Sequence, residues 1–160
     1  MSMEWPMDAE YFAQHIQCSR KDKEECLRII PALATVAFSA QGGVKTLEEL
    51  MDGPWSQQAT PFLKKAVQLY MDVKNVEQIR RILYQTILAS GYAGPQFLEA
   101  VLITEVMAAL FLREADPGFI FGYLAPSFFG IEYEDMVTDC YQAFRREWFA
   151  AREGGAPQQA

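Results

Sequence analysis

Two glutamates interrupt the most apolar stretch of the chain, residues 97–112, and their setting suits acid–base chemistry. A carboxylic acid in apolar surroundings holds its proton to higher pH, as a general acid or a protonation switch requires. Glu99 and Glu105 lie about 120° apart on a helix, so they do not form a pair on one face. The structural alternative places Glu99 in a first helical turn, favoured by the helix dipole, and lets Glu105 pair with an arginine or face solvent. We favour the structural alternative and keep Glu105 as the candidate buried acid.

The other residue types that support catalysis or metal binding are few and scattered. His15 is the only histidine, and Cys18, Cys26 and Cys140 form no C-x-x-C pair. Zinc sites usually need several such ligands, and di-metal carboxylate bundles need Glu-x-x-His pairs, which the sequence lacks. No serine has a nucleophile-elbow context, and residues 91–94 lack the lysine of a phosphate-binding loop. The sequence therefore predicts no catalytic residue, no metal and no cofactor, with His15 as a surface or partly buried helix residue.

The composition is that of an acidic chain with enough apolar residues for a core. Of 160 residues, 51% are hydrophobic, and the formal net charge is −7. One domain of this length buries roughly 70% of the surface that its unfolded chain exposes. The basic residues are scattered, which makes nucleic acid and anionic membrane surfaces poor partners. The N-terminus lacks the regions of a signal peptide and the cysteines indicate reduced thiols, so we expect a cytoplasmic protein.

The apolar stretch itself does not predict a membrane span. A spanning helix needs about 20 apolar residues with few charges. Residues 97–112 are fewer than this and include two acids. We therefore expect a core helix there and no membrane insertion.

Helix-end signals are frequent along the chain. Thr60-Pro61 and Asp116-Pro117 each place a capping side chain before a proline at the first helical position. Asn75 is the cap of a helix that Gly91 ends. The helix from Pro61 is followed by a turn capped by Asn75 and a second amphipathic helix, and the helix from Pro95 by a turn capped by Asp116 and a shorter helix. This order predicts two helix-turn-helix hairpins.

Further signals define the elements of the N-terminal half. Asp22 is expected to cap a helix that Pro31 kinks or splits. Thr46 and Glu49 have the spacing of a capping box, which would open a short helix. Residues 55–59 are expected to form a loop.

The overall pattern is helical, because no stretch of convincing length alternates with period two. We predict an all-α single domain over residues 1–152, a bundle of about seven to eight helices. Residues 153–160 are predicted to be a flexible C-terminal tail, since they are polar and contain glycine and proline.

Residues 118–131 concentrate aromatic side chains in a short span that also has three glycines and a proline. Such a run either fills a core or forms an exposed contact patch. We expect mainly core, with part of the set facing a partner, because a short helix and a loop do not hide every ring. The candidate contact residues are Phe119, Phe121, Tyr123, Phe128 and Phe129.

Residues 61–87, PFLKKAVQLYMDVKNVEQIRRILYQTI, resemble the cytoplasmic region of MotA-type flagellar stator proteins. That family has a similar Pro-Phe-Leu-Lys-Lys start, an apolar helix ending in a Val-Asp turn, and a second amphipathic helix. Residues 43–48, GVKTLE, resemble the family's G-x-x-x-L-E element, and residues 99–124 resemble the stretch that follows its last membrane span. The family's membrane helices have no counterpart in this sequence.

The resemblance implies a partner and a contact residue. In the family, a charged pair in the first cytoplasmic segment contacts the flagellar rotor. Its acidic member corresponds to Glu48, while Ala40 stands where the basic member would be. The implied partner is a flagellar rotor or chemotaxis component, and a homodimer is also a candidate assembly.

These observations lead to one expected function and two alternatives. We expect a non-catalytic cytosolic protein-interaction domain, similar to the stator cytoplasmic region and linked to bacterial motility. The first alternative is a domain that binds a small molecule or lipid in an apolar pocket within residues 101–129, which contain five Phe and one Met. The second is an enzyme that uses Glu105.

Overall fold

The structure, a computed structural model, describes residues 8–113 and 116–155, and every regular element within these residues is helical. This confirms the all-α prediction. Nine of the described α-helices have four residues or more: α1 (Ala9–His15), α2 (Arg20–Cys26), α3 (Ile29–Ala40), α4 (Val44–Asp52), α5 (Trp55–Gln58), α6 (Pro61–Asp72), α7 (Val76–Ser90), α8 (Pro95–Leu112) and α11 (Glu134–Gly155).

Three shorter elements form one continuous helical segment between α8 and α11. They are α9 (Pro117–Phe119), the π-helix η1 (Ile120–Leu124) and α10 (Ala125–Ser127), and a 3₁₀ turn, η2 (Ile131–Tyr133), follows. The Ala125 N–H bonds to the Ile120 carbonyl, five residues back. Pro126 has no N–H to offer, and the wider π turn comes directly before it. The helical segment includes Pro126 and ends at Ser127.

The predicted helix ends are mostly confirmed at the level of individual hydrogen bonds. Thr60 accepts from the Leu63 N–H at 3.3 Å, Asn75 from Gln78 at 3.0 Å, and Asp116 from Phe119 at 2.8 Å. Gly91 ends α7 in the left-handed conformation that glycine adopts without strain. The chain is also interrupted before Pro31, where α2 ends and α3 begins. These signals therefore located the beginnings of α6, α7 and α9 and the end of α7.

Two predicted caps were wrong. Ser19 caps α2, and Asp22 is the third residue of the helix, from which its side chain closes the capping box. Helix α4 begins at Val44 after Gly43, whose φ of 94° suits glycine. Thr46 then lies inside the helix, where its hydroxyl donates to the Gly42 carbonyl at 3.1 Å.

Two expected irregular segments are partly helical. Residues 55–58 form the single turn α5 instead of a loop. Helix α11 continues to Gly155, three residues into the expected tail. The rest of that tail, residues 156–160, lies outside the described residues.

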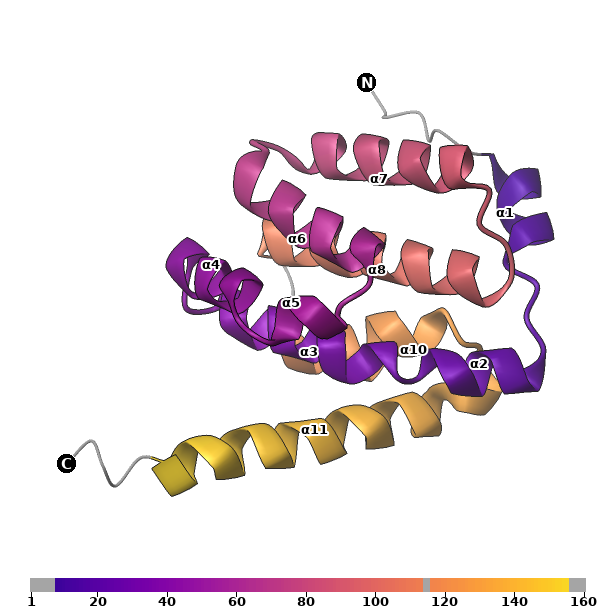
Figure 1. The fold of residues 1–160 in the computed structure, drawn as a ribbon. Coiled ribbons are helices and arrows are strands. Elements are labelled where there is room, and N and C mark those ends of the chain that lie inside the picture. Colours follow the sequence, from indigo (N-terminus) through magenta and orange to yellow (C-terminus); the bar gives the residue numbers. More distant parts are fainter. Residues whose placement is uncertain (1–7, 114–115, 156–160) are drawn as a thin grey trace.

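Helix α8 is the centre of the fold. It packs against α7, α6, α2 and α3, and eleven of its eighteen residues are buried. Figure 1 shows α7 and α8 as the two arms of a hairpin, with α6 beside them. Among the described helices, α8 alone has the length and apolar composition of a membrane span, yet 61% of that window is buried inside the protein. A buried core helix meets the same criteria, which agrees with the expectation from the sequence.

Helix α11 packs against α3 through an aromatic stack and runs along the lower edge of the molecule (Figure 1). Phe38 of α3 contacts four rings, with centroids 5.4–6.3 Å away. Such ring pairs stabilise packing beyond the area that they bury. The four rings belong to Tyr141, Phe144, Trp148 and Phe149.

Candidate functional site

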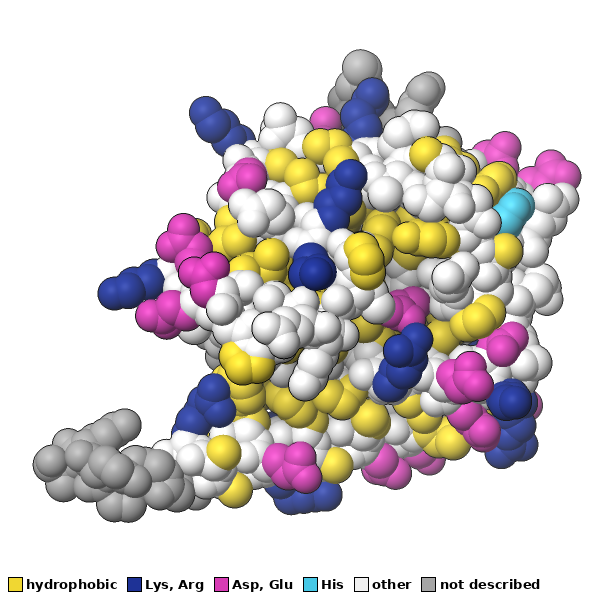
Figure 2. All heavy atoms as spheres, viewed as in Figure 1, with side chains coloured by type: hydrophobic (Ala, Val, Ile, Leu, Met, Phe, Trp, Pro, Cys, Tyr) yellow, Lys and Arg dark blue, Asp and Glu magenta, His cyan; other side chains and the backbone are white. Residues whose placement is uncertain are grey.

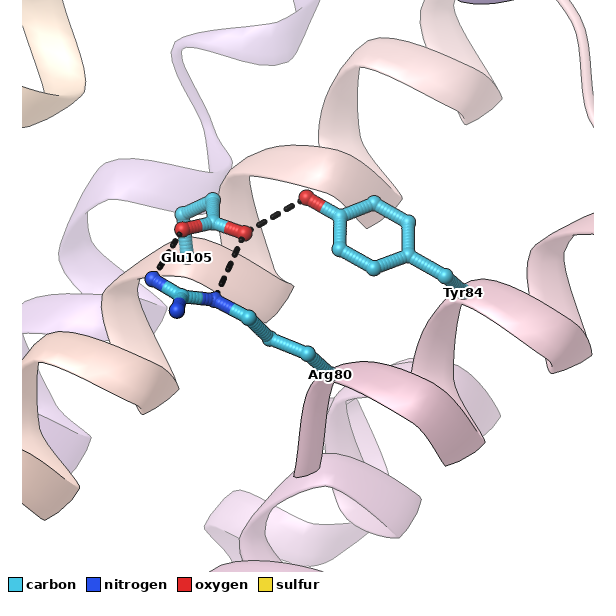
Figure 3. A network of polar contacts seen from close by, with 3 residues as sticks. All are labelled: Arg80, Tyr84 and Glu105. Atoms are coloured by element: carbon cyan, nitrogen blue, oxygen red, sulfur yellow. Dashed lines mark hydrogen bonds and ion pairs between the residues drawn. The ribbon is translucent and has the colours of Figure 1, made fainter. Parts of the chain in front are cut away.

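The candidate buried acid, Glu105, lies between α7 and α8 and receives three hydrogen bonds (Figure 3). Arg80 donates from Nη2 to Oε1 at 2.9 Å and from Nε to Oε2 at 3.3 Å. The Tyr84 hydroxyl donates to Oε2 at 2.6 Å. The Arg80 and Glu105 side chains are 26% and 14% exposed, and Tyr84 is fully buried. Both oxygens of the carboxylate are therefore engaged within the protein.

Electrostatics reinforce this arrangement. Burial raises the pKa of Tyr84 well above its usual value, and the negative charge of Glu105 raises it further. Tyr84 therefore keeps its proton and remains a donor to Glu105. The expected pairing with an arginine is confirmed, and the three residues clamp α7 to α8.

Arg80 and Tyr84 were not predicted from the sequence, although a signal for one of them existed. Arg80 and Glu105 lie at equal distances along the chain from the middle of the turn at residues 91–94. In an antiparallel hairpin such residues face each other, so the pairing follows once the hairpin is accepted. Tyr84 lies one turn further along α7, on the same side as Arg80.

Glu99 lies just past the first turn of α8, in which the sequence analysis had placed it. It is the fifth residue of the helix, and its side chain is 12% exposed. Its charged partner among the described residues is Arg28, with Nη2 3.7 Å from Oε2, and the Arg28 side chain is 74% exposed. Burial raises the pKa of Glu99, and Arg28 offsets this only in part.

The raised pKa of Glu99 makes stability depend on pH with a defined sign. The folded state holds this proton to higher pH than the unfolded chain, whose carboxyl titrates near 4.5. The charged form of Glu99 therefore lowers the free energy of unfolding, and this loss is complete above the pKa of Glu99 in the folded state. The loss disappears as pH falls towards 4.5. We expect Glu99→Gln to raise the free energy of unfolding at pH 7, with an advantage over wild type that shrinks on acidification. Urea unfolding at a series of pH values measures this, and an advantage that grows as pH falls would contradict it.

The remaining candidates for metal or thiol chemistry are structural. His15 Nδ1 lies 2.8 Å from the Tyr11 carbonyl oxygen, and its ring stacks on Tyr11 with centroids 3.8 Å apart. All three cysteines are free, and burial raises the pKa of the Cys26 thiol to about 12. Within the described residues no group of three or more His, Cys, Asp or Glu could hold a metal ion.

The aromatic segment divides into core and surface. Phe121 and Phe129 are buried, and Phe121 stacks on Tyr141 with centroids 4.8 Å apart. Phe119 and Tyr123 are 52% and 72% exposed, one helical turn apart, with ring centroids separated by 5.7 Å. Phe128 is half-buried. We call the exposed pair, Phe119 and Tyr123, the aromatic patch.

Glu48 is exposed on α4 and lines a hollow of about 540 Å³ between α4 and α6. The hollow also has the carboxylates of Asp52 and Asp72 in its wall, so it is acidic. Figure 2 shows acidic side chains gathered at this α4 end of the molecule.

A second hollow, of about 620 Å³, has Gly43, Arg113, Asp116 and Pro117 in its wall. It shares no lining residue with the acidic hollow, and neither Glu48 nor a candidate aromatic residue lines it. The structure therefore does not bring Glu48 and the aromatic candidates together in one hollow.

Comparisons with models of known protein families, with curated proteins and with solved structures gave no match.

Proposed function

We propose that this chain is a non-catalytic protein-interaction domain that binds its partner through the aromatic patch. The observation that carries the proposal is the exposure of Phe119 and Tyr123 in a segment whose other rings are partly or wholly buried. Aromatic side chains supply much of the binding energy at protein interfaces. Two adjacent exposed rings on one helical segment therefore offer an anchor for a partner.

The surroundings favour a partner with apolar and basic groups. The acidic hollow has the carboxylates of Glu48, Asp52 and Asp72 in its wall. The chain as a whole has a net charge of −7. A basic region next to an apolar anchor would complement this face and accelerate encounter.

The engaged state of Glu105 supports a non-catalytic role, because a carboxylate that accepts three hydrogen bonds is poorly placed to exchange protons with a substrate. The resemblance of residues 61–87 to the stator cytoplasmic region supplies the biological setting of the proposal. We propose a cytoplasmic, motility-related protein whose partner is a flagellar rotor or chemotaxis component.

The double variant Phe119→Ser/Tyr123→Ser tests the proposal. We expect the wild-type chain to capture a motor or chemotaxis component from a motile bacterial lysate, and deletion to impair swimming. Loss of one interface anchor costs about 2 kcal/mol, so the double variant should weaken this binding at least roughly thirtyfold. The matched control is Ile131→Ser, which removes a side chain that is 84% exposed on η2, outside the patch.

Two results would count against the proposal. Equal capture by wild type and the double variant would remove the aromatic patch from the interface. Normal swimming without any captured motor component would remove the motility setting. Sedimentation of the free protein over a concentration series tests a second copy as partner, since a dimer through the patch would dissociate in the double variant.

A further inference from the structure

A third hollow, of about 200 Å³, shares no lining residue with the two hollows described above. It lies where the starts of α6 and α8 meet the beginning of α3. Its wall includes the rings of Phe62 and Tyr92, which are packed edge to face with centroids 6.1 Å apart. Its acidic group is Glu99.

The carboxylate of Glu99 accepts no hydrogen bond from the described residues, in contrast to Glu105. Glu99 and Glu105 belong to the same helix and have nearly equal exposure, 12% and 14%. Glu105 accepts three hydrogen bonds, whereas the described residues donate none to Glu99. The 3.7 Å separation from Arg28 is an ion contact beyond hydrogen-bond length. The Glu99 oxygens are not fully enclosed and line the hollow, so they are accessible as acceptors to a ligand that enters it.

The lining of the hollow defines what would satisfy this carboxylate. A cation with N–H donors makes charge-assisted hydrogen bonds to a carboxylate, about twice as strong as neutral ones. Aromatic rings attract cations and also pack against the methylene groups beside them. At about 30 Å³ for a group of the size of water, the volume holds roughly six such groups. A short alkyl chain with one charged head group matches this size.

We propose that the hollow at Glu99 binds a small organic cation, a primary ammonium or guanidinium head with a short apolar body packed against the rings of Phe62 and Tyr92. The same chemistry exists in free amines and in the lysine or arginine side chain of a partner protein. The site is independent of the aromatic patch, so it stands or falls separately from the proposed function.

Arg28 is the internal competitor of this ligand. Its guanidinium is the cation nearest to Glu99 in the structure, and its largely exposed side chain is free to turn into solvent when another cation arrives. Removal of Arg28 should therefore strengthen binding, while removal of the Glu99 charge weakens it. A site that merely collects apolar molecules would show neither effect.

Calorimetric and amide-shift titrations of the full chain with n-butylammonium test the site, with n-butanol as the neutral ligand of the same chain length. We expect saturable one-to-one binding of n-butylammonium and at least tenfold weaker binding of n-butanol. Glu99→Gln should weaken n-butylammonium binding about tenfold or more, and Arg28→Gln should strengthen it severalfold. Glu24→Gln makes the same chemical change in the exposed Arg20–Glu24 pair of α2 and should leave the affinity unchanged.

Thermal unfolding of each variant confirms that it is folded before titration. Equal affinity of wild type and Glu99→Gln would overturn the proposal, as would equal affinity for the amine and the alcohol, or no saturable binding of the amine. Titration with a lysine capped at both ends distinguishes the two sources of the cation, a free amine and the side chain of a partner protein. If it binds like n-butylammonium, a partner's side chain is the ligand, and if it fails to bind while n-butylammonium binds, the ligand is a free amine.

Discussion

Replacing Glu105 by alanine is expected to lower the free energy of unfolding by about 3 kcal/mol. The substitution leaves the Arg80 guanidinium without its carboxylate and the buried Tyr84 hydroxyl without its acceptor. Breaking a buried ion pair by removing one partner costs about 3–5 kcal/mol, because the other charge stays behind. The lower end applies here, since Arg80 is 26% exposed and keeps some contact with water. Urea unfolding monitored by circular dichroism measures the change.

The matched control is Glu24→Ala in α2, where Glu24 pairs with Arg20 at 3.2 Å. Both side chains of that pair are exposed, so its loss should cost no more than about 0.5 kcal/mol. The stability loss of Glu105→Gln should lie between those of Glu105→Ala and Glu24→Ala, because the amide oxygen still accepts a hydrogen bond from one donor. Similar losses for Glu105→Ala and Glu24→Ala would show that the network does not clamp α7 to α8.

Replacing Phe121 by alanine is expected to lower the free energy of unfolding by about 4 kcal/mol. Phe121 is fully buried and stacks on Tyr141, so truncation removes apolar burial and leaves a cavity. Phenylalanine-to-alanine changes in protein cores cost about 3–5 kcal/mol. Thermal and urea unfolding both report the loss.

Phe119→Ala, two residues away, provides the matched comparison. Its ring is 52% exposed and contacts Tyr123, which is exposed as well. The same truncation should change stability by no more than about 0.5 kcal/mol. If Phe119→Ala destabilised the fold as much as Phe121→Ala, the patch would be part of the core and would be unsuitable as an interface.

The division of the aromatic segment illustrates what sequence alone could and could not predict. The sequence correctly indicated that residues 118–131 contribute rings to both the core and the surface. It did not indicate which rings are buried and which are exposed. The π turn at Ile120–Leu124 changes the angle between successive side chains, so spacing of 3.6 residues per turn does not assign the faces there. Nothing in the local sequence except Pro126 points to that turn.

Helix ends were predictable where a proline or glycine fixed the backbone. They were less predictable where more than one residue could begin the helix. Thr60 and Asp116 precede prolines, and both caps were found. Thr46 had an equally good capping pattern, yet Gly43 supplied an earlier start for α4. The Glu105 network depended on tertiary pairing of α7 with α8, and the depth of Glu99 depended on Arg28 remaining at the surface.

The apolar surface of α8 on nearly all sides has a consequence for the newly made chain. A helix of this kind is insoluble by itself and attracts chaperones, membranes and other nascent chains until it is covered. Four of the helices that cover it, α2, α3, α6 and α7, precede it in the sequence, so the ribosome releases them first, and η1 follows it. The order of elements therefore lets α8 be enclosed as it emerges, before α11 has been synthesised.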